Sequence, residues 1–229
     1  MKSNFSFSNK RIENILKNIK RNSVIVDVGC DHCYTSIYAL KTKKAKFAYN
    51  IDINKKPLEN GISNIKKQSL FLKTKNFIAN GLQTNEIEKK IDFCVISGIG
   101  GRNIIDIIEN ANSDIKIKYF IFVPNNNEYE LRIFLQKNGF LEKKTEYVYE
   151  NNYFYQIMLV KNTKIKKNKL MKNINEKYFL LGKYKRNNKV LEQYISFLIK
   201  KYEEIKKKSN SNKNNDKIDL LNLILNKLK

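Results

Sequence analysis

Val24-Ile25-Val26-Asp27-Val28-Gly29-Cys30-Asp31-His32-Cys33-Tyr34 is the stretch that decides the fold of this 229-residue chain. Its first five residues are apolar and β-branched apart from Asp27, which predicts a short buried strand. Gly29 follows where the strand must turn, and Asp31 is placed to cap a helix that begins near Tyr34. A strand, a glycine turn and a helix N-terminus form a unit that can cradle a nucleotide.

The turn holds a single glycine, so it differs from the dinucleotide motif Gly-x-Gly-x-x-Gly. A pyrophosphate requires close backbone approach at several points, which disfavours NAD as the ligand. A cofactor without phosphates, such as S-adenosylmethionine, requires less. An ordinary strand-to-helix turn with no ligand is the alternative.

Four more strands are expected, each before a helix or a polar turn, and a hairpin follows them. The strands are residues 47–53, 77–79, 93–96 and 119–123, and the hairpin joins 143–149 to 153–160. An amphipathic helix over 9–22, with Lys and Arg opposite its apolar face, precedes the first strand. Pro57 is expected at the first position of a helix that runs to Lys67. This order predicts an α/β fold, a doubly wound Rossmann-like sheet of seven strands with its ligand at the strand C-termini.

Polar and glycine-rich segments stand at those strand ends. Asp52 ends the second strand, where an acidic side chain commonly accepts hydrogen bonds from both ribose hydroxyls of an adenosine. Asn80-Gly81 follows the third strand and can meet an adenine edge. Ser97-Gly98-Ile99-Gly100-Gly101 follows the fourth, and its glycines let the backbone lie against a ligand; Arg102 could then reach a phosphate. The alternatives are a surface carboxylate at Asp52 and a flexible turn at the glycines.

The composition points to an anionic partner. The chain has 45 Lys and Arg against 22 Asp and Glu, a net charge of +23. Nucleic acid fits this excess better than a membrane surface, although codon bias in a Lys-, Asn- and Ile-rich proteome could supply part of it. No apolar run approaches the ~18 residues that cross a membrane, and Met1 to Lys10 has no apolar signal core. We therefore expect a cytoplasmic protein.

Three cysteines, Cys30, Cys33 and Cys94, are an odd number in a chain without a secretion signal, so a disulfide framework is not expected. Cys30-x-x-Cys33 could instead suggest zinc or redox chemistry. A zinc site would also need His32, and the adjacent His32 and Cys33 are hard to aim at one tetrahedral ion. We predict no metal and assign the cysteines to packing.

The composition changes after residue 160. Residues 161–169 are a basic linker or arm, and 161–229 carry 20 Lys and Arg against 6 Asp and Glu, a net of +14. Apolar residues then repeat at heptad spacing, which predicts an antiparallel coiled coil; they are Leu191, Ile195, Leu198, Tyr202, Ile205, Ile218, Leu221, Leu225 and Leu228. Such a basic rod could lie along phosphates, or its charge could simply be a solvated surface.

Together these motifs resemble one family. Asp27-x-Gly-x-Asp-His-x-Tyr34, Asn80-Gly81-Leu82, Ser97-Gly-Ile-Gly-Gly101 and Val123-Pro124-Asn125 occur in this order before a C-terminal coiled coil. The chain resembles, over essentially its whole length, the bacterial tRNA (adenine(22)-N1)-methyltransferases, the TrmK family of class I S-adenosylmethionine-dependent enzymes. The resemblance implies methyl transfer to N1 of an adenine in the D-arm region of tRNA. We expect a methyltransferase domain at 1–160, a tRNA-binding helical domain at 161–229, and a monomer.

The cofactor-binding residues we predict lie in the strand-end segments. Asn80 stands where the family usually has Asp, and an amide can still pair with an adenine edge; Cys30 replaces a usual Ser. The predicted set is Asp27, Gly29, Cys30, Asp31, His32, Asp52, Ile53, Asn80, Gly81, Ser97, Gly98, Ile99 and Gly100.

Two residues are predicted to be catalytic. N1 of adenine has a lone pair and can attack a sulfonium methyl without a strong base, while positive charge develops on the ring. Asp31 follows the cofactor turn and can stabilise that charge, and Tyr34 can stack on an adenine turned out of the tRNA. The alternatives are a helix cap or cofactor contact for Asp31 and core packing for Tyr34.

Two other functions are compatible with the motifs. One is methylation of a small molecule or a protein, against which the basic tail argues. The other is a catalytically inactive nucleic-acid-binding module, which the intact set of Asp27, Gly29 and Asp52 disfavours.

Overall fold

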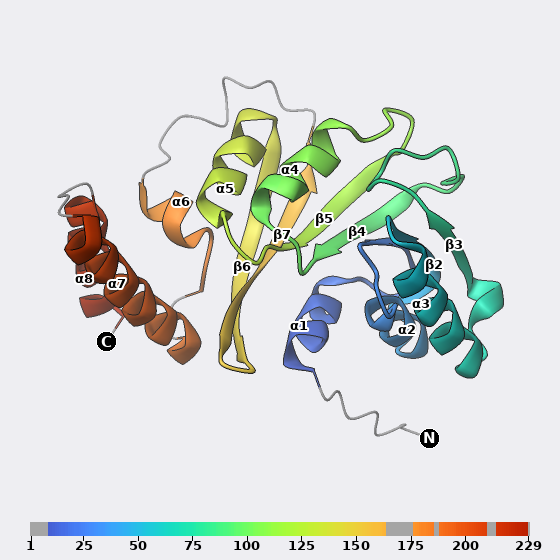
Figure 1. The fold of residues 1–229 in the computed structure, drawn as a ribbon, viewed down its shortest axis with the longest axis horizontal. Helices are drawn as coiled ribbons and strands as arrows, with labels where there is room; N and C mark the ends of the chain where they lie inside the picture. The colour runs from blue at the N-terminus through green and yellow to red at the C-terminus, as the bar shows by residue number, and fades with distance from the viewer. Residues whose placement is uncertain (1–8, 164–175, 186–187, 210–213, 229) are drawn as a thin grey trace.

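The computed structural model describes residues 9–163, 176–185, 188–209 and 214–228. A single seven-stranded sheet forms its centre, in the order β3-β2-β1-β4-β5-β7-β6 (Figure 1). This confirms the predicted Rossmann-like fold. The strands are β1 (Ser23–Val28), β2 (Ala45–Asp52), β3 (Thr74–Ile78), β4 (Ile91–Ser97), β5 (Ile117–Val123), β6 (Phe140–Glu150) and β7 (Tyr153–Asn162).

Helices follow most of the strands, and three more lie at the C-terminal side of the molecule (Figure 1). They are α1 (Lys10–Asn18), α2 (Tyr34–Lys41), α3 (Lys55–Lys67), α4 (Gly101–Glu109), α5 (Glu128–Lys137), α6 (Glu176–Leu181), α7 (Lys189–Ser209) and α8 (Asn215–Asn226), with a short 3-10 turn, η1 (Phe71–Lys73).

The strand order indicates at which edge of the sheet a ligand can bind. β1 pairs in parallel with both β2 and β4, so the chain winds to one side through β2 and β3 and to the other through β4 and β5. Ligands of open α/β sheets bind at such a reversal, outside the carboxyl ends of the strands. The turns after β1 and β4 therefore meet where the sequence predicts the site.

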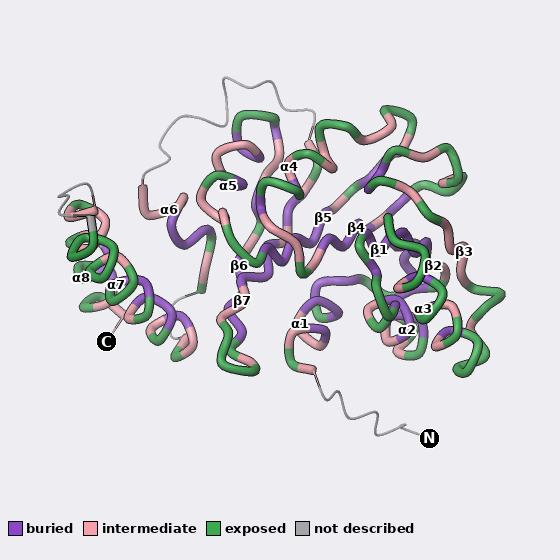
Figure 2. Tube along the Cα trace, viewed as in Figure 1, coloured by how far each residue is buried: buried purple, intermediate pink, exposed green. Residues whose placement is uncertain are grey.

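The central strands of the sheet, β1, β2, β4 and β5, are largely buried, as strands covered on both faces are (Figure 2). Alternate residues of β1 enter opposite cores. Val24, Val26 and Val28 pack with α4 and α5 residues, whereas Ile25 packs with α1 and α2. A continuous apolar strand is the pattern that this two-sided burial requires.

Several element boundaries differ from the predictions. The helix expected over 9–22 ends at Asn18. α3 begins at Lys55, so Pro57 is its third residue, where its missing N–H is still outside the helical hydrogen-bond ladder. The sequence did not predict α6. The expected basic arm lies largely in 164–175, outside the described residues, and Lys161 belongs to β7.

The C-terminal helices pack against each other and against the sheet edge. Leu191, Ile195 and Leu198 on α7 and Leu221 on α8 are buried in one apolar cluster, as the heptad spacing predicts. The same cluster contains Tyr147 of β6, with Leu180 and Leu181 of α6. Ile205, the last predicted seam residue of α7, is exposed. The helical pair is therefore partly a layer on the sheet rather than a free rod.

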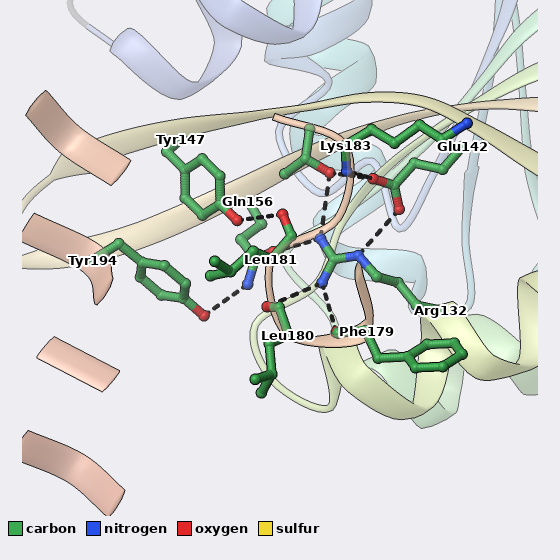
Figure 3. Close-up of polar contacts among 10 residues, drawn as sticks. Arg132, Glu142, Tyr147, Gln156, Phe179, Leu180, Leu181, Lys183 and Tyr194 are labelled. Atoms are coloured by element: carbon green, nitrogen blue, oxygen red, sulfur yellow. Dashed lines mark hydrogen bonds and ion pairs between the residues drawn. The ribbon is translucent and has the colours of Figure 1, made fainter. Parts of the chain in front are cut away.

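A buried ion pair joins α5 and β6 to the C-terminal segment (Figure 3). Arg132 on α5 donates from Nε to Glu142 Oε2 at 3.1 Å, and both side chains are inaccessible to solvent. Its Nη2 donates to Gln156 at 2.6 Å, and its Nη1 donates to the carbonyl oxygens of Phe179 and Leu180 at 3.3 and 3.5 Å. Every guanidinium nitrogen therefore has an acceptor.

Candidate functional site

A cavity of about 730 Å³ opens at the carboxyl ends of β1–β4. Twelve of the thirteen predicted cofactor-binding residues line it, and so does Tyr34. The thirteenth, Gly100, does not. The sequence thus located the cavity through glycines and polar residues at strand ends, which is where chain reversal and ligand access coincide.

The turn after β1 is held by the neighbouring strand. The N–H groups of Gly29 and Cys30 both donate to the carbonyl of Ile51 in β2, at 2.9 and 3.1 Å. Gly29 has φ +69°, a left-handed conformation that glycine adopts at little cost, and a Cβ built there would meet no atom within 4 Å. The cavity floor at this point is bare backbone, open to a ligand.

Asp31 does not cap α2, contrary to the expectation. The N-cap residue is Cys33, in a left-handed conformation, and it makes no side-chain cap hydrogen bond. The Asp31 carboxylate is largely exposed and lies 3.6 Å from His32 Nε2. The backbone of Asp31 has φ +45°, a conformation that Asp and Asn tolerate better than most residues. The carboxylate is therefore available to a ligand.

Tyr34 is not a core residue. Its side chain is 48% exposed at the cavity, and its ring centroid lies 5.6 Å from that of His32. This excludes core packing as the reason for a tyrosine here. The exposed ring offers a flat face for an incoming base.

Asp52 anchors the wall formed by the β1 and β2 turns. It is buried, and its two carboxylate oxygens accept hydrogen bonds from the backbone N–H groups of Asp31, at 3.1 Å, and Asn54, at 2.9 Å. Each oxygen keeps a second lone pair that can accept from a ribose hydroxyl. Ile53, next to it, lines the cavity and is exposed.

The glycines after β4 have two different functions. Gly98 has φ +85° and lines the cavity with Ser97 and Ile99, as predicted. Gly100 instead faces the loop after β5, since a Cβ there would lie 2.7 Å from Asn126 Oδ1. Gly100 is not among the residues that line the cavity, and its assignment to the cofactor stays a prediction. Its lack of a side chain lets the two loops approach each other.

The turn after β3 also reaches the cavity. Asn80 and Gly81 both line it, and Gly81 has φ +61° with a would-be Cβ 2.8 Å from Ile107 of α4. Four further polar residues line the cavity and were not predicted from the sequence. They are isolated on loops and helices without a motif, and only the folded chain brings them together: Gln83, Asn103, Asp106 and Asn110.

Arg11 is the most informative residue that sequence reasoning missed. It lies on α1, whose basic residues we assigned to the solvent face, yet it lines the cavity and its Nε is buried without a hydrogen-bond partner. A Cβ built on Gly98 would stand 3.8 Å from its Nη1. A buried donor without an acceptor is costly, so a ligand acceptor at this position would stabilise the site.

Asp27 is a buried carboxyl beside that guanidinium. Burial raises its pKa from 3.8 to about 7, while the charge of Arg11 and a hydrogen bond with Thr35 oppose the rise. The nearby Asp52 raises the pKa further. A carboxyl with this pKa changes its charge near neutral pH, and a cationic ligand beside it would stabilise its ionised form.

The cysteine pair is a packing feature. Cys33 Sγ lies 3.5 Å from Cys30 Sγ, and both side chains are buried. The hydrogen bond with Cys33, together with burial, raises the pKa of Cys30, and burial raises that of Cys94. Within the described residues, no group of three His, Cys, Asp or Glu side chains could hold a metal ion.

The cavity fits S-adenosylmethionine chemically. That cofactor carries a sulfonium, an ammonium and a carboxylate on one arm and an adenosine on the other. The carboxyls of Asp27 and Asp31 complement the cations, and the orphaned Arg11 Nε complements an anion. Asp52 and Asn80 line the same cavity, and their side chains are of the kinds that can hydrogen-bond to a ribose and to an adenine edge. Among the described helices, none is long and apolar enough to cross a membrane.

Comparisons with known proteins find related methyltransferases. A putative tRNA methyltransferase of Mycoplasma genitalium is 32% identical over 144 residues, 62% of this chain. The tRNA (adenine(22)-N(1))-methyltransferase of Bacillus subtilis is 26% identical over 153 residues, 66% of this chain. Each alignment covers 63% of the relative's own length.

Solved structures match almost the entire chain. TrmK of M. capricolum, in complex with S-adenosyl-homocysteine, is 27% identical with a TM-score of 0.76 and 95% of its chain covered. A putative tRNA (m1A22) methyltransferase of Streptococcus pneumoniae, in complex with S-adenosyl-L-methionine, is 25% identical with a TM-score of 0.82 and 99% covered. The match covers 96% of this chain in the first case and 95% in the second.

The sequence model of one family, TrmK, tRNA (adenine(22)-N(1))-methyltransferase, matches residues 25–229. This range contains the strand-end segments that line the cavity and the C-terminal helices. The chain belongs to the tRNA (adenine(22)-N(1))-methyltransferase family, enzymes that use S-adenosylmethionine.

Proposed function

We propose that this protein transfers the methyl group of S-adenosylmethionine to N1 of adenine 22 in tRNA, with Asp31 and Tyr34 acting on the target base. The observation that carries the proposal is the cavity at the β1–β4 edge, where an exposed carboxylate and an exposed ring stand beside the residues that fit the cofactor. The basic helical segment at 161–229 binds the tRNA in this proposal, and one copy of the chain suffices. A tRNA substrate places its action in the cytoplasm.

The residues have separate tasks in the reaction. The cofactor supplies an electrophilic methyl group when bound. Asp52 fixes the β1 and β2 turns and accepts from the ribose. Tyr34 stacks on the extruded adenine. The adenine N1 lone pair would form the new bond to the methyl carbon as the carbon–sulfur bond breaks and its electron pair goes to sulfur, which leaves S-adenosylhomocysteine. Asp31 stabilises the positive charge that then spreads over the adenine ring, an effect that is strongest where water is excluded.

The direct test is a methylation assay. The full chain is incubated with a tRNA transcript and cofactor that carries a labelled methyl group, and the modified nucleoside and its position are identified. We expect 1-methyladenosine at position 22 and no label when that adenine is replaced by guanine. Label in protein or in another nucleoside would contradict the proposal.

Asp52→Ala should weaken cofactor binding by about 2–3 kcal/mol, the value of two charge-assisted hydrogen bonds. The rate at saturating cofactor should change less, because Asp52 contacts the ribose side and not the reacting atoms. Isothermal titration calorimetry measures the effect, with the exposed Asp114→Ala as the matched control. An unchanged dissociation constant would refute the ribose assignment.

Cofactor affinity should rise with pH through the Asp27 titration. The carboxyl is mostly neutral below its pKa of about 7 and ionised above it, and the ionised form attracts the cationic cofactor. Affinity should therefore increase roughly tenfold from pH 6 to pH 8 through this group. Calorimetry across that range measures it, and Asp27→Asn should bind more weakly without this component. Identical pH profiles for both proteins would contradict the prediction.

A further inference from the structure

A second cavity, of about 320 Å³, lies between the N-terminus of α5, the tip of the β6–β7 hairpin and α7. Seven of its sixteen lining residues are aromatic. Phe197 on α7 and Tyr149 and Tyr153 on the hairpin keep exposed rings. Phe154 lies beneath them, with its ring centroid 5.5 Å from that of Phe197 and 4.6 Å from that of Tyr149.

The polar groups around these rings are those that a nucleotide uses. Lys201, exposed on α7, lines the cavity and can meet a phosphate. Three consecutive asparagines after β5 offer amide donors and acceptors to a base edge, and Glu128 can accept from an exocyclic amine. An aromatic floor with a lysine at the rim is how proteins hold single-stranded bases.

The loop of asparagines is bonded to the turn that lines the cofactor cavity. Asn125 donates from its backbone N–H to the carbonyl of Ile99 at 2.9 Å and from Nδ2 to that of Gly98 at 2.6 Å. On its other side, the carbonyl of Asn125 accepts from the hydroxyl of Tyr153. One loop therefore separates the cofactor cavity from the aromatic cavity. An RNA strand whose target adenine lies in the cofactor cavity passes close to the aromatic cavity.

We infer that this aromatic cavity binds a second, unmodified nucleobase of the tRNA, stacked on Phe197 and Tyr149. The inference rests on the proposed function for its ligand, a tRNA. The base is one that leaves its own stack when the target adenine is turned out, and stacking on the protein offsets the contacts it loses. The cavity is thereby a positioning site for the substrate and takes no part in the chemistry.

Phe197→Ala is the test, and the chain offers a matched control. Phe71, in η1 at the opposite edge of the sheet, is exposed to the same fraction, 46%. Phe197→Ala should weaken tRNA binding by about 5- to 150-fold, the range that loss of one stacking ring gives. Phe71→Ala should leave it unchanged. Cofactor affinity, and the single-turnover rate at saturating tRNA, should be the same for all three proteins.

Further variants separate stacking from other contacts. Phe197→Trp should restore tRNA affinity and Phe197→Leu should not, because leucine has no π face. The slope of log affinity against log salt should not change for Phe197→Ala, whereas Lys201→Ala should lower it by about 0.7–0.9. A tRNA with 2-aminopurine at positions flanking the target should lose fluorescence on wild-type protein and lose less on Phe197→Ala.

Two results would overturn the inference. One is equal tRNA affinity for Phe197→Ala and Phe71→Ala, and the other is full rescue by leucine, which would indicate apolar packing with a protein segment instead of a base. In either case normal methylation of adenine 22 would leave the proposed function intact. Conversely, tRNA affinity that depends on the ring of residue 197, without methylation by the wild-type protein, would refute only the proposed function.

Discussion

Replacing Arg132 with methionine should lower the free energy of unfolding by about 3–5 kcal/mol, the cost of leaving one member of a buried ion pair alone. Glu142 would remain in the interior, where Thr145 and the backbone N–H of Lys183 still donate to its carboxylate but the positive charge of Arg132 is gone. Two carbonyls of α6 and the amide oxygen of Gln156 would lose their donor as well. Because methionine is also a long side chain, the expected loss of stability comes from the missing charge and donors rather than from lost volume.

Urea denaturation measures this effect from the shift in midpoint at constant slope. Arg102→Met, an exposed arginine on α4, is the control and should change stability by less than about 0.5 kcal/mol. The double variant Arg132→Met with Glu142→Leu should recover part of the loss, because no charge is then left unpaired. A single variant as stable as the wild type would show that the ion pair contributes nothing to the fold.

Asp31→Asn should reduce the single-turnover methylation rate by roughly 10²-fold or more, as loss of one preorganised electrostatic contact to a transition state does. The amide has almost the same shape, and asparagine tolerates the left-handed backbone found at this position. The fold and the tRNA affinity should therefore persist. At saturating cofactor and tRNA, the expected loss is in the rate of methyl transfer.

Rapid-quench measurements at saturating cofactor and tRNA give that rate. Asp114→Asn, an exposed carboxylate near the N-terminal edge of β5, makes the same chemical change away from the cavity and should be neutral. A near-normal rate for Asp31→Asn would mean that its carboxylate is a bystander. A large loss of cofactor affinity with a normal rate would limit the role of Asp31 to cofactor binding.

The fold and the cavity were predictable because both depend on local patterns. The apolar strand Val24–Val28, the turn at Gly29 and the acidic end at Asp52 each carry a signal within a few residues. Parallel strands then bring those signals to one edge, whichever helices lie between them. The family resemblance added the reaction and the target base, which no local pattern contains.

The remaining features depend on contacts between distant parts of the chain. Arg11 sits on the polar side of an amphipathic helix, and only the packing of α1 turns it toward the cavity. Gly100, which the glycine motif assigned to the ligand, also leaves room for Asn126. Arg132 was assigned no role, because the carbonyls that surround it come from residues some 47 positions later in the chain. Spacing alone cannot report such partners.

The ion pair of Arg132 and Glu142 also sets an order for folding during synthesis. A growing chain folds from its N-terminus as it leaves the ribosome. All seven strands have been translated by Asn162, yet Arg132 still lacks its acceptors at Phe179 and Leu180, and Tyr147 lacks the carbonyl of Leu181 to which its hydroxyl donates. The sheet therefore reaches its native packing only after translation has passed residue 181, so the methyltransferase part and the helical tail mature together rather than one after the other.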